Sequence, residues 1–201
     1  MKVRYITIER EFGSGGTRIA AGVSKTCGIP CYGREILETV AKEQNVSVQT
    51  LEDYEESVSG SFLYSMFVMT QSQTGDPDLL SPEAKLYVAE TRVIRRLADQ
   101  QPCIFLGHCA SEALKEQDGV LRVFVRACEE EKEKRIIQDY GVPEKQVLSV
   151  CRKVNRRRAN YYSFCTRKKW NDLSNYDVVL DSTKLGIEQC AAALSALFLH
   201  E

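Results

Sequence analysis

A run of small residues near the start of the chain has the composition of a phosphate-binding loop. Its members are Gly13, Ser14, Gly15, Gly16 and Thr17, and it follows a β-rich segment. Glycines leave successive backbone N–H groups uncovered, so several of them can surround one anion. The helical pattern that begins at Thr17 adds the partial positive charge of a helix N-terminus. The run therefore predicts a phosphate cradle, and the alternative is a tight turn without a ligand.

The match of this run to the P-loop pattern G-x-x-x-x-G-K-[ST] is incomplete. With Gly15 as the second glycine and Thr17 as the hydroxyl residue, Arg10 occupies the first glycine position. Gly16 then replaces the lysine that clamps the phosphates, while Thr17 keeps a hydroxyl that can ligate Mg²⁺. Arg10 or Arg18 could supply the lost charge. Arg18 lies about 200° around the helix axis from Gly16, so Arg10 is the better candidate.

A second chemically active stretch runs from Arg152 to Asn171 and contains no acid. Its basic residues are Arg152, Lys153, Arg156, Arg157, Arg158, Arg167, Lys168 and Lys169, and its aromatic residues are Tyr161, Tyr162, Phe164 and Trp170. The stretch could bind nucleic acid, with the aromatic rings as stacking platforms. Its arginines could instead close as a mobile lid over transferring phosphates, or form a solvated helix face. The phosphate loop elsewhere in the chain favours the lid.

Length and composition restrict the class of protein. The 201 residues are enough for one domain, or for a core with a small insertion. Apolar residues make up 43% of the chain, and 27 Lys+Arg balance 28 Asp+Glu, as in a soluble globular protein. The longest apolar runs, Phe62 to Met69 and Ala191 to Leu199, are far shorter than the ~20 residues that cross a bilayer. We therefore expect no membrane partner, and the charged start of the chain does not resemble a signal peptide.

The eight cysteines indicate a reducing environment. They lie at positions 27, 31, 103, 109, 128, 151, 165 and 190, and no pair has zinc-finger or redox spacing. Most of them lie inside apolar stretches, where a free cysteine behaves as a small hydrophobic residue. We therefore expect free thiols, no thiolate metal site and a cytoplasmic location.

The elements that position these groups alternate between strands and helices. Val3 to Ile8 is a β-rich run that ends at the glycine loop, and the apolar spacing from Thr17 to Cys27 predicts a helix that Gly28 and Pro30 close. Further β-rich segments are Cys103–Leu106, Leu121–Val125 and Val178–Leu180, each followed by a helical pattern. Such alternation predicts an α/β fold in which helices cover both faces of a parallel sheet.

A long helical stretch, roughly Arg34 to Gln100, separates the first strand–helix unit from the second. It is broken at residues 75–77 by Gly-Asp-Pro. Ser81, Pro82 and Glu83 begin its last helix with an N-cap, a proline at the first helical position and an acid in the first turn. We therefore interpret this stretch as an insertion with a boundary near residue 81.

Motifs along nearly the whole chain resemble those of the cytidylate-kinase-like family of P-loop proteins. They are Ile6-Thr7-Ile8, the run from Arg10 to Gly16, Gly28-Ile29-Pro30-x-Tyr32, Ile104-x-x-Gly107, Arg156-x-Arg158-Ala159-Asn160-Tyr161-Tyr162, Lys168-Lys169-Trp170 and Asn175-Tyr176-Asp177. The run from Leu180 to Glu188 is similar to the end of bacterial cytidylate kinases. These motifs are specific for the family, but not for a substrate.

The resemblance implies a P-loop NTPase fold of the nucleoside monophosphate kinase type. Such a fold has three layers with a five-stranded parallel sheet, a helical acceptor-binding insertion and an arginine-rich lid. One domain would span residues 1–201, with its core at 1–33, 82–150 and 172–201. The helical insertion would be 34–81 and the lid region 151–171.

The resemblance also implies roles for individual residues. The ATP phosphates would be bound by Gly13, Ser14, Gly15, Gly16 and Thr17, with Thr17 as the Mg²⁺ ligand. The catalytic residues would be Arg135 in the helix after the fourth strand and Arg158 in the lid, together with Arg10, which the P-loop comparison above gives as the substitute for the lost lysine. The acceptor would be bound by Arg34, His108 and Arg156.

Three positions depart from true cytidylate kinases. Gly16 stands at the P-loop lysine position, His108 at an arginine position and Asn155 at the position of a lid aspartate. His108 follows Gly107 at the end of a strand, where open parallel sheets bind their ligands, so it could contact the acceptor or be structural. Loss of one preorganised charge stabiliser commonly costs about 10²–10³ in rate, which leaves weak or absent activity on CMP open.

These observations favour an ATP- and Mg²⁺-dependent transfer of a phosphoryl group to a nucleoside monophosphate or similar small acceptor, at a phosphate or a hydroxyl. The alternative is a non-catalytic nucleotide-binding or regulatory protein with a degenerate P-loop, and Gly16 favours it. A nucleic-acid-binding module is a weaker alternative, because the net charge is -1 and no nucleic-acid motif is found.

Overall fold

The computed structural model describes residues 2–57 and 81–200 of the chain. Its centre is a sheet of five parallel strands in the order β2-β3-β1-β4-β5. The strands are β1 (Tyr5–Arg10), β2 (Cys31–Tyr32), β3 (Cys103–Leu106), β4 (Val120–Arg126) and β5 (Val178–Asp181). The predicted five-stranded parallel sheet is confirmed.

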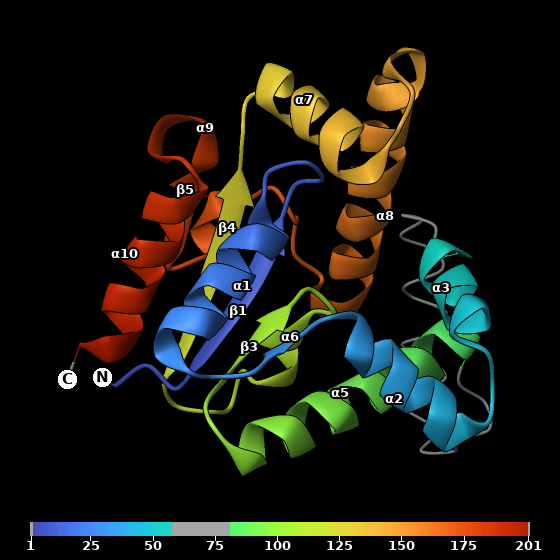
Figure 1. Cartoon of the computed structure of the whole chain (residues 1–201). Coiled ribbons are helices and arrows are strands. Elements are labelled where there is room, and N and C mark those ends of the chain that lie inside the picture. The colour runs from blue at the N-terminus through green and yellow to red at the C-terminus, as the bar shows by residue number, and fades with distance from the viewer. Residues whose placement is uncertain (1, 58–80, 201) are drawn as a thin grey trace.

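Helices cover both faces of the sheet and complete a three-layer α/β fold (Figure 1). The described α-helices are α1 (Gly16–Cys27), α2 (Arg34–Gln44), α3 (Val48–Ser57), α5 (Pro82–Gln100), α6 (Ala110–Ala113), α7 (Glu129–Tyr140), α8 (Val147–Thr166), α9 (Ser182–Leu185) and α10 (Ile187–Leu199). Short 3₁₀ turns lie at Glu144–Gln146 and Leu173–Asn175. This layering is the one that alternating strands and helices predict.

Strand β1 lies in the middle of the sheet and has an apolar cluster on each side. Tyr5 belongs to the cluster that α2, α3, α5 and α6 close, whereas Ile6 and Ile8 belong to the cluster that α1 and α10 close. Successive side chains of a strand point to opposite faces of the sheet. Glu9 and Arg10, the last two residues of β1, therefore leave the strand on opposite sides.

The first strand has the predicted length of six residues but lies two positions further along the chain, at Tyr5–Arg10 instead of Val3–Ile8. The β-rich pattern ends at Ile8, but Glu9 and Arg10 continue the parallel ladder beside Phe124 and Val125 of β4. The predicted end is wrong because the two charged residues find polar surroundings at the edge of the sheet. Strand β2 was not visible as a pattern, since a two-residue strand is too short to show alternation.

The start of α5 confirms the predicted N-cap. The Ser81 hydroxyl oxygen accepts a hydrogen bond from the Ala84 N–H at 3.3 Å, and Pro82 is the first residue of the helix. The helix before it, α2, begins at Arg34, where the insertion was expected to begin. The predicted break at residues 75–77 lies outside the described residues, and the division into core, insertion and lid stays a prediction.

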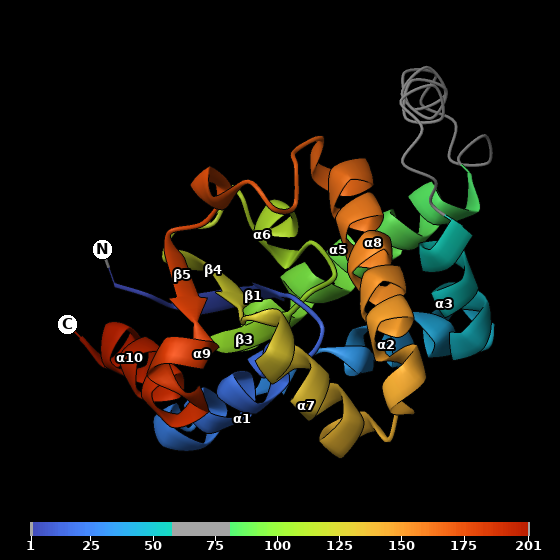
Figure 2. The same ribbon diagram turned by 90° about the horizontal axis from the view of Figure 1, so that it is seen from above.

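The segment expected to form the lid lies mainly in α8. This helix is continuous over 20 residues and packs against α7 and α3 (Figure 2). It lies near the edge of the sheet at which the parallel strands end (Figure 1). Its inner face can therefore reach the ends of β1 and β3.

The cysteines carry free thiols, as expected. All eight cysteines are free, and three of them, Cys103, Cys109 and Cys190, are buried.

Among residues 2–57 and 81–200, no helix is both long and apolar enough to cross a membrane.

Candidate active site

The loop between β1 and α1 has the backbone geometry of an anion cradle. Gly13 and Gly15 have φ values of 78° and 80°, which L side chains rarely adopt. A Cβ atom on Gly13 would lie 2.8 Å from the Lys132 carbonyl oxygen, so a side chain does not fit there. Helix α1 begins at Gly16 and has no side-chain cap, so the N–H groups of its first turn have no acceptor inside the helix. These N–H groups are the ones that helix N-termini offer to phosphate.

Arg135 braces this loop from the outside. Its Nη1 donates hydrogen bonds to the Ser14 carbonyl oxygen at 3.1 Å and to the Ser182 hydroxyl oxygen at 2.8 Å. The Ser182 hydroxyl in turn donates to the Ser14 carbonyl oxygen at 2.7 Å. The guanidinium is thus held against the carbonyl oxygens of the loop. It fixes the loop from behind and does not line the pocket described below.

Arg10 connects the glycine loop to the end of β3. A Cβ atom on Gly16 would lie 2.7 Å from the Arg10 Cβ and 2.8 Å from its Cγ, and a Cβ atom on Gly107 would clash with the Arg10 Nη1. The stem of Arg10 therefore covers Gly16, and its guanidinium lies beside Gly107. Gly16 is not among the glycines with positive φ, so this contact, and not the backbone, excludes a side chain there. The absence of a lysine at position 16 is therefore linked to the presence of an arginine at position 10, because the two side chains would compete for the same space.

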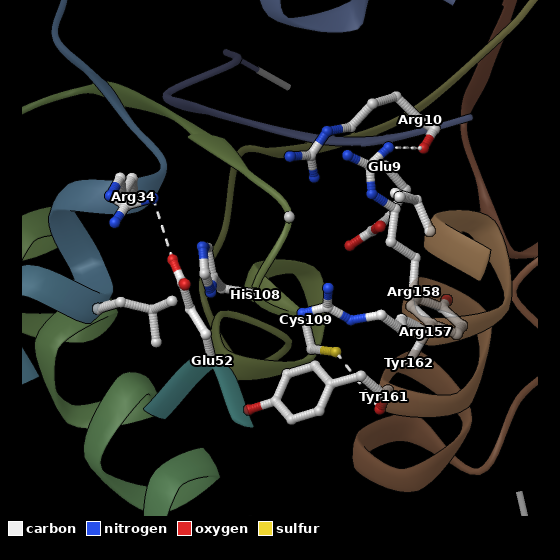
Figure 3. A pocket seen from close by; sticks show the side chains of 13 residues that line it. Glu9, Arg10, Arg34, Glu52, His108, Cys109, Arg157, Arg158, Tyr161 and Tyr162 are labelled. Atoms are coloured by element: carbon white, nitrogen blue, oxygen red, sulfur yellow. Dashed lines mark hydrogen bonds and ion pairs between the residues drawn. The ribbon is translucent and has the colours of Figure 1, made fainter. Parts of the chain in front are cut away.

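A pocket of about 400 Å³ opens beside Arg10 at the edge of the sheet where the strands end (Figure 3). It is lined by Glu9, Arg10, Arg34, Leu37, Glu52, Gly107, His108, Cys109, Val154, Arg157, Arg158, Tyr161 and Tyr162. Four arginines face two glutamates in this lining, so the pocket carries a net positive charge. A small anionic molecule complements it.

Arg158 is enclosed between β1 and α8. Its Nη1 donates to the Arg10 carbonyl oxygen at 2.8 Å, and its guanidinium lies 5.8 Å from the centre of the Phe12 ring. Burial, and then the charge of Arg10, lower the pKa of Arg158. Two neighbouring guanidinium groups repel each other more strongly in a poorly solvated site, and an anion between them removes that cost. The pair therefore makes the end of β1 a favourable position for a phosphate group.

Asn155 docks α8 on the glycine loop. Its Oδ1 accepts a hydrogen bond from the Phe12 N–H at 2.7 Å, and the Cys151 thiol lies 3.9 Å from the Phe12 carbonyl oxygen. On the other side of the loop, the Glu11 carboxylate pairs with Lys132 at 3.1 Å. These contacts fix the position of the loop relative to both α7 and α8. Asn155, one of the three departures from cytidylate kinases, thus contacts the loop backbone.

His108 lies in a turn of unusual backbone conformation. Gly107, His108 and Cys109 have consecutive positive φ values of 84°, 56° and 50°, and two of these residues are not glycine. The His108 Nδ1 lies 2.7 Å from Oε1 of Glu90 on α5, and the Tyr161 hydroxyl of α8 donates to Oε2 of the same carboxylate. A buried carboxylate thus orients a histidine that lines the pocket.

Cys109 and Glu9 complete the polar lining. Burial raises the pKa of the Cys109 thiol well above its ordinary value, so this cysteine stays protonated and is a poor nucleophile. Glu9 is buried and accepts a hydrogen bond from the Trp170 Nε1–H at 3.0 Å. That bond ties the end of β1 to the segment after α8.

The pocket brings together some of the predicted site residues and not others. It gathers Arg10, Arg34, His108 and Arg158. Arg156 is exposed, because the pocket face of α8 consists of positions 154, 157, 158, 161 and 162, which follow helical spacing. Thr17 is exposed at the start of α1. Arg34 forms an ion pair with Glu52 at 3.0 Å at the rim of the pocket.

Three residues at the site were missed by sequence reasoning. They are Glu9, Glu52 and Glu90. Arg157 and Tyr161 were named in the basic and aromatic stretch but were given no individual role, and their i, i+4 spacing places both on the pocket face of α8. A charged residue at the end of a buried strand would have drawn attention to Glu9. No local pattern marks Glu52 or Glu90.

A profile of the cytidylate kinase-like family matches residues 5–184. The chain belongs to this family. Membership supports phosphoryl transfer as its general chemistry, and no curated protein matches the chain significantly.

Solved structures with low sequence identity share the fold of this family member. An uncharacterized protein from Eubacterium ventriosum ATCC 27560 has a TM-score of 0.73 at 23% identity, with both chains covered completely. A protein from Thermus thermophilus has a TM-score of 0.54 at 19% identity over the whole of both chains. Shikimate kinase from Bacteroides thetaiotaomicron has a TM-score of 0.53 at 11% identity, with 96% of each chain covered. These similarities and the parallel sheet identify the α/β P-loop fold.

Proposed function

We propose that this protein is an ATP-dependent kinase that transfers a phosphoryl group to a nucleoside monophosphate or a similar small anionic acceptor. The observation that carries the proposal is the position of Arg10. Its stem covers the first residue of α1, and its guanidinium lies at the end of β3, beside the arginine-lined pocket. One side chain therefore lies between a phosphate cradle and a cationic pocket, where it can hold a donor and an anionic acceptor close to each other.

The glycine loop fits the phosphates of ATP. A Cβ atom on Gly13 would meet α7 and one on Gly15 would meet Ile187 of α10, so the two glycines let the loop pack against these helices. The first turn of α1 presents N–H groups to the cradle. Thr17 supplies a hydroxyl at the start of the helix for Mg²⁺. Bound Mg²⁺ would neutralise part of the charge on the terminal phosphates.

The arginines of the site would position the acceptor and stabilise developing charge. Arg34 and Arg157 line the outer pocket and suit the anionic group of the acceptor. Arg10 and Arg158 lie close together at the end of β1, where the phosphoryl group would pass. In a poorly solvated site, preorganised charges of this kind act more strongly than they do in water.

A non-catalytic nucleotide-binding protein is the second candidate, and the missing P-loop lysine favours it. Such a protein would bind ATP through the same loop without transferring its phosphoryl group. A nucleic-acid interface is less favoured, because Tyr161, Tyr162 and Trp170 of the basic stretch are buried in one cluster and offer no exposed stacking platform.

A transfer screen separates the two candidates. The purified protein is incubated with [γ-³²P]ATP, Mg²⁺ and a panel of nucleoside monophosphates and small hydroxylated anions, while calorimetry measures ATP binding. We expect radioactive product from at least one acceptor. Binding of ATP with no product from any acceptor would contradict the kinase and support the binding protein.

Arg10→Ala and Arg18→Ala form a matched pair for the same assay. Arg10→Ala should weaken ATP binding and lower transfer, because it removes the charge between cradle and pocket. Arg18 is exposed, and its Nη1 lies 3.8 Å from the Asp139 Oδ2. Arg18→Ala should therefore change neither ATP binding nor transfer. Equal ATP affinity of the wild type and Arg10→Ala would reject Arg10 as the substitute for the lysine.

A further inference from the structure

We infer that His108 is the general base of the transfer and that the group phosphorylated is a hydroxyl of a small anionic molecule. The inference rests on the proposed phosphoryl transfer and specifies its acceptor. It is carried by the cluster of Glu90, His108 and Tyr161, which anion binding alone does not explain.

The geometry of His108 is that of an oriented base. Its Nδ1 lies 2.7 Å from the Glu90 Oε1, and Glu90 has no exposed side-chain surface. The His108 ring keeps 12% of its surface exposed and lines the pocket opposite the α8 arginines (Figure 3). A carboxylate that accepts the Nδ1 proton fixes the ring and its tautomer, and Nε2 becomes the basic nitrogen. Glu90 is therefore a positioning residue.

A second bond holds the carboxylate itself. The Tyr161 hydroxyl donates to the other oxygen of Glu90, so the cluster joins α5, the turn after β3 and α8. The turn holds His108 and Cys109 at positive φ, a conformation that costs energy for residues other than glycine. The fold thus maintains strain and a buried carboxylate at the same place, and both place the histidine ring in the pocket.

The chemistry of the acceptor decides whether a base is useful. A phosphate monoester has a second pKa of about 6 and is already a dianion at neutral pH, so its oxygen attacks without losing a proton. An alcohol keeps its proton and needs a base as the new bond forms. A base in the acceptor pocket therefore indicates a hydroxyl acceptor. The replacement of the arginine of cytidylate kinases by His108 agrees with this change of acceptor.

The proposed step balances as follows. The acceptor O–H gives its proton to Nε2 of His108 while its oxygen forms a bond to the γ-phosphorus. The bond between that phosphorus and the bridging oxygen breaks, and ADP leaves with the electron pair. His108 then releases the proton to water. The products are a phosphate monoester, ADP and one proton.

The pocket also indicates what else the acceptor carries. Arg34 and Arg157 line it together with His108, which suits a carboxylate or phosphate on the same small molecule. The acceptor class is thus a hydroxylated anion, such as a sugar phosphate or a hydroxy acid.

The test uses wild type, His108→Gln and His200→Gln, which removes the other histidine of the chain. Each is incubated with ATP, Mg²⁺ and either hydroxylated anions or nucleoside monophosphates, and ³¹P NMR identifies the product as a monoester or a diphosphate. We expect a monoester, and a kcat that His108→Gln lowers by about 10²-fold or more with little change in acceptor KM. His200→Gln should match the wild type.

The pH profile adds a readout that a structural role would not change. Among the described residues, several charged and titratable groups lie around His108. They are Glu90 on α5, Arg157, Arg158, Tyr161 and Tyr162 on α8, Arg34 on α2, Glu52 on α3, Glu9 and Arg10 on β1, and the adjacent Cys109. Because the base acts in its neutral form, kcat/KM of the wild type should fall as the pH is lowered. In the His108→Gln variant, kcat/KM should not show this fall at low pH. An unchanged profile in that variant would overturn the role of His108.

The outcomes distinguish this inference from the proposed function. Diphosphate formation from a nucleoside monophosphate would keep the kinase and overturn the hydroxyl acceptor. No product from any acceptor, despite ATP binding, would overturn both. Imidazole ¹⁵N NMR gives a check independent of turnover, with His200→Gln assigning the two signals. It should find the Nδ1–H tautomer of His108 in the wild type, and the Nε2–H tautomer would contradict the inference.

Discussion

The proposed donor side and the proposed acceptor side of the site are built in different ways. The donor side is a short run of backbone, residues 13–17, that Arg135 braces from behind. The acceptor side consists of side chains from β1, α2, α3, α8 and the turn after β3. Backbone geometry recognises any phosphate, whereas a constellation of side chains selects one molecule. The difference teaches that, under the proposed function, a local loop would bind the donor, whereas tertiary packing would determine which acceptor binds.

The largest effect on catalysis outside His108 should come from Arg158. Arg158→Ala removes a guanidinium that contacts the Arg10 carbonyl oxygen and lies at the boundary between the two sides. We expect transfer to fall by about 10²–10³-fold, as for other preorganised charge stabilisers. The matched control is Arg156→Ala on the exposed face of the same helix. Radiolabelled transfer assays compare the two, and an equal loss in both would show that the pocket face of α8 has no special role.

The donor side should be most sensitive at Gly13. Gly13→Ala introduces a Cβ atom 2.8 Å from a backbone oxygen at a φ of 78°. We expect a loss of roughly 2 kcal/mol or more in the free energy of unfolding and weaker ATP binding. Gly28→Ala is the control, because its φ is also positive but no atom lies within 4 Å. It should cost roughly 1–2 kcal/mol and leave ATP affinity unchanged. Urea unfolding and calorimetry provide both quantities.

Gly16 tests how the two sides are coupled. Gly16→Lys alone should weaken ATP binding, because the new Cβ atom meets the stem of Arg10 at 2.7 Å. The double variant Arg10→Gly/Gly16→Lys restores the usual P-loop arrangement and should recover most of the affinity. Calorimetry on the two single variants and the double variant measures the coupling. Additive losses would contradict the idea that the two positions share one space.

The smallest effect, a change in stability alone, should come from the ion pair between Arg122 and Asp177, which does not line the pocket. Arg122 donates to Asp177 at 2.6 Å and holds the pKa of that carboxyl below its ordinary value. A lowered carboxyl pKa stabilises the fold above about pH 4, and this contribution is lost as the pH falls towards the folded-state pKa. Arg122→Ala should cost about 0.2–1 kcal/mol at pH 7, since the pair is partly exposed, and less near pH 3. Urea unfolding at both pH values tests this, and transfer should not change.

The sequence predicted much of the fold, including the strand–loop–helix unit at the proposed donor side, because these features depend on local patterns. The strand, the glycine loop and the helix that Gly28 ends are adjacent in the chain, and Ser81 caps α5 as expected. The resemblance in motifs added the five-stranded sheet. Strand β2 escaped because two residues carry no periodicity. That Arg10 covers Gly16 could not be seen either, because side-chain packing across the loop leaves no mark in the sequence.

The acceptor side could be predicted only in part, because distant segments build it. Arg34 and His108 were expected at the acceptor and line the pocket. Glu90 lies 18 positions from His108 and 71 from Tyr161, and it becomes their partner only when α5, the turn after β3 and α8 pack together. Within α5, Glu90 looks like any charged residue of an amphipathic helix.

The central claim is that Arg10 connects the proposed donor and acceptor sides of the site. The most direct test measures steady-state kinetics with both substrate concentrations varied. It compares the wild type with Thr17→Ala, Arg34→Ala and Arg10→Ala, and it varies ATP and acceptor independently. The account predicts that Thr17→Ala raises only the KM for ATP and Arg34→Ala raises only the KM for the acceptor, whereas Arg10→Ala impairs the use of both. If Arg10→Ala changed the kinetic constants for only one of the two substrates, or for neither, the account would be contradicted.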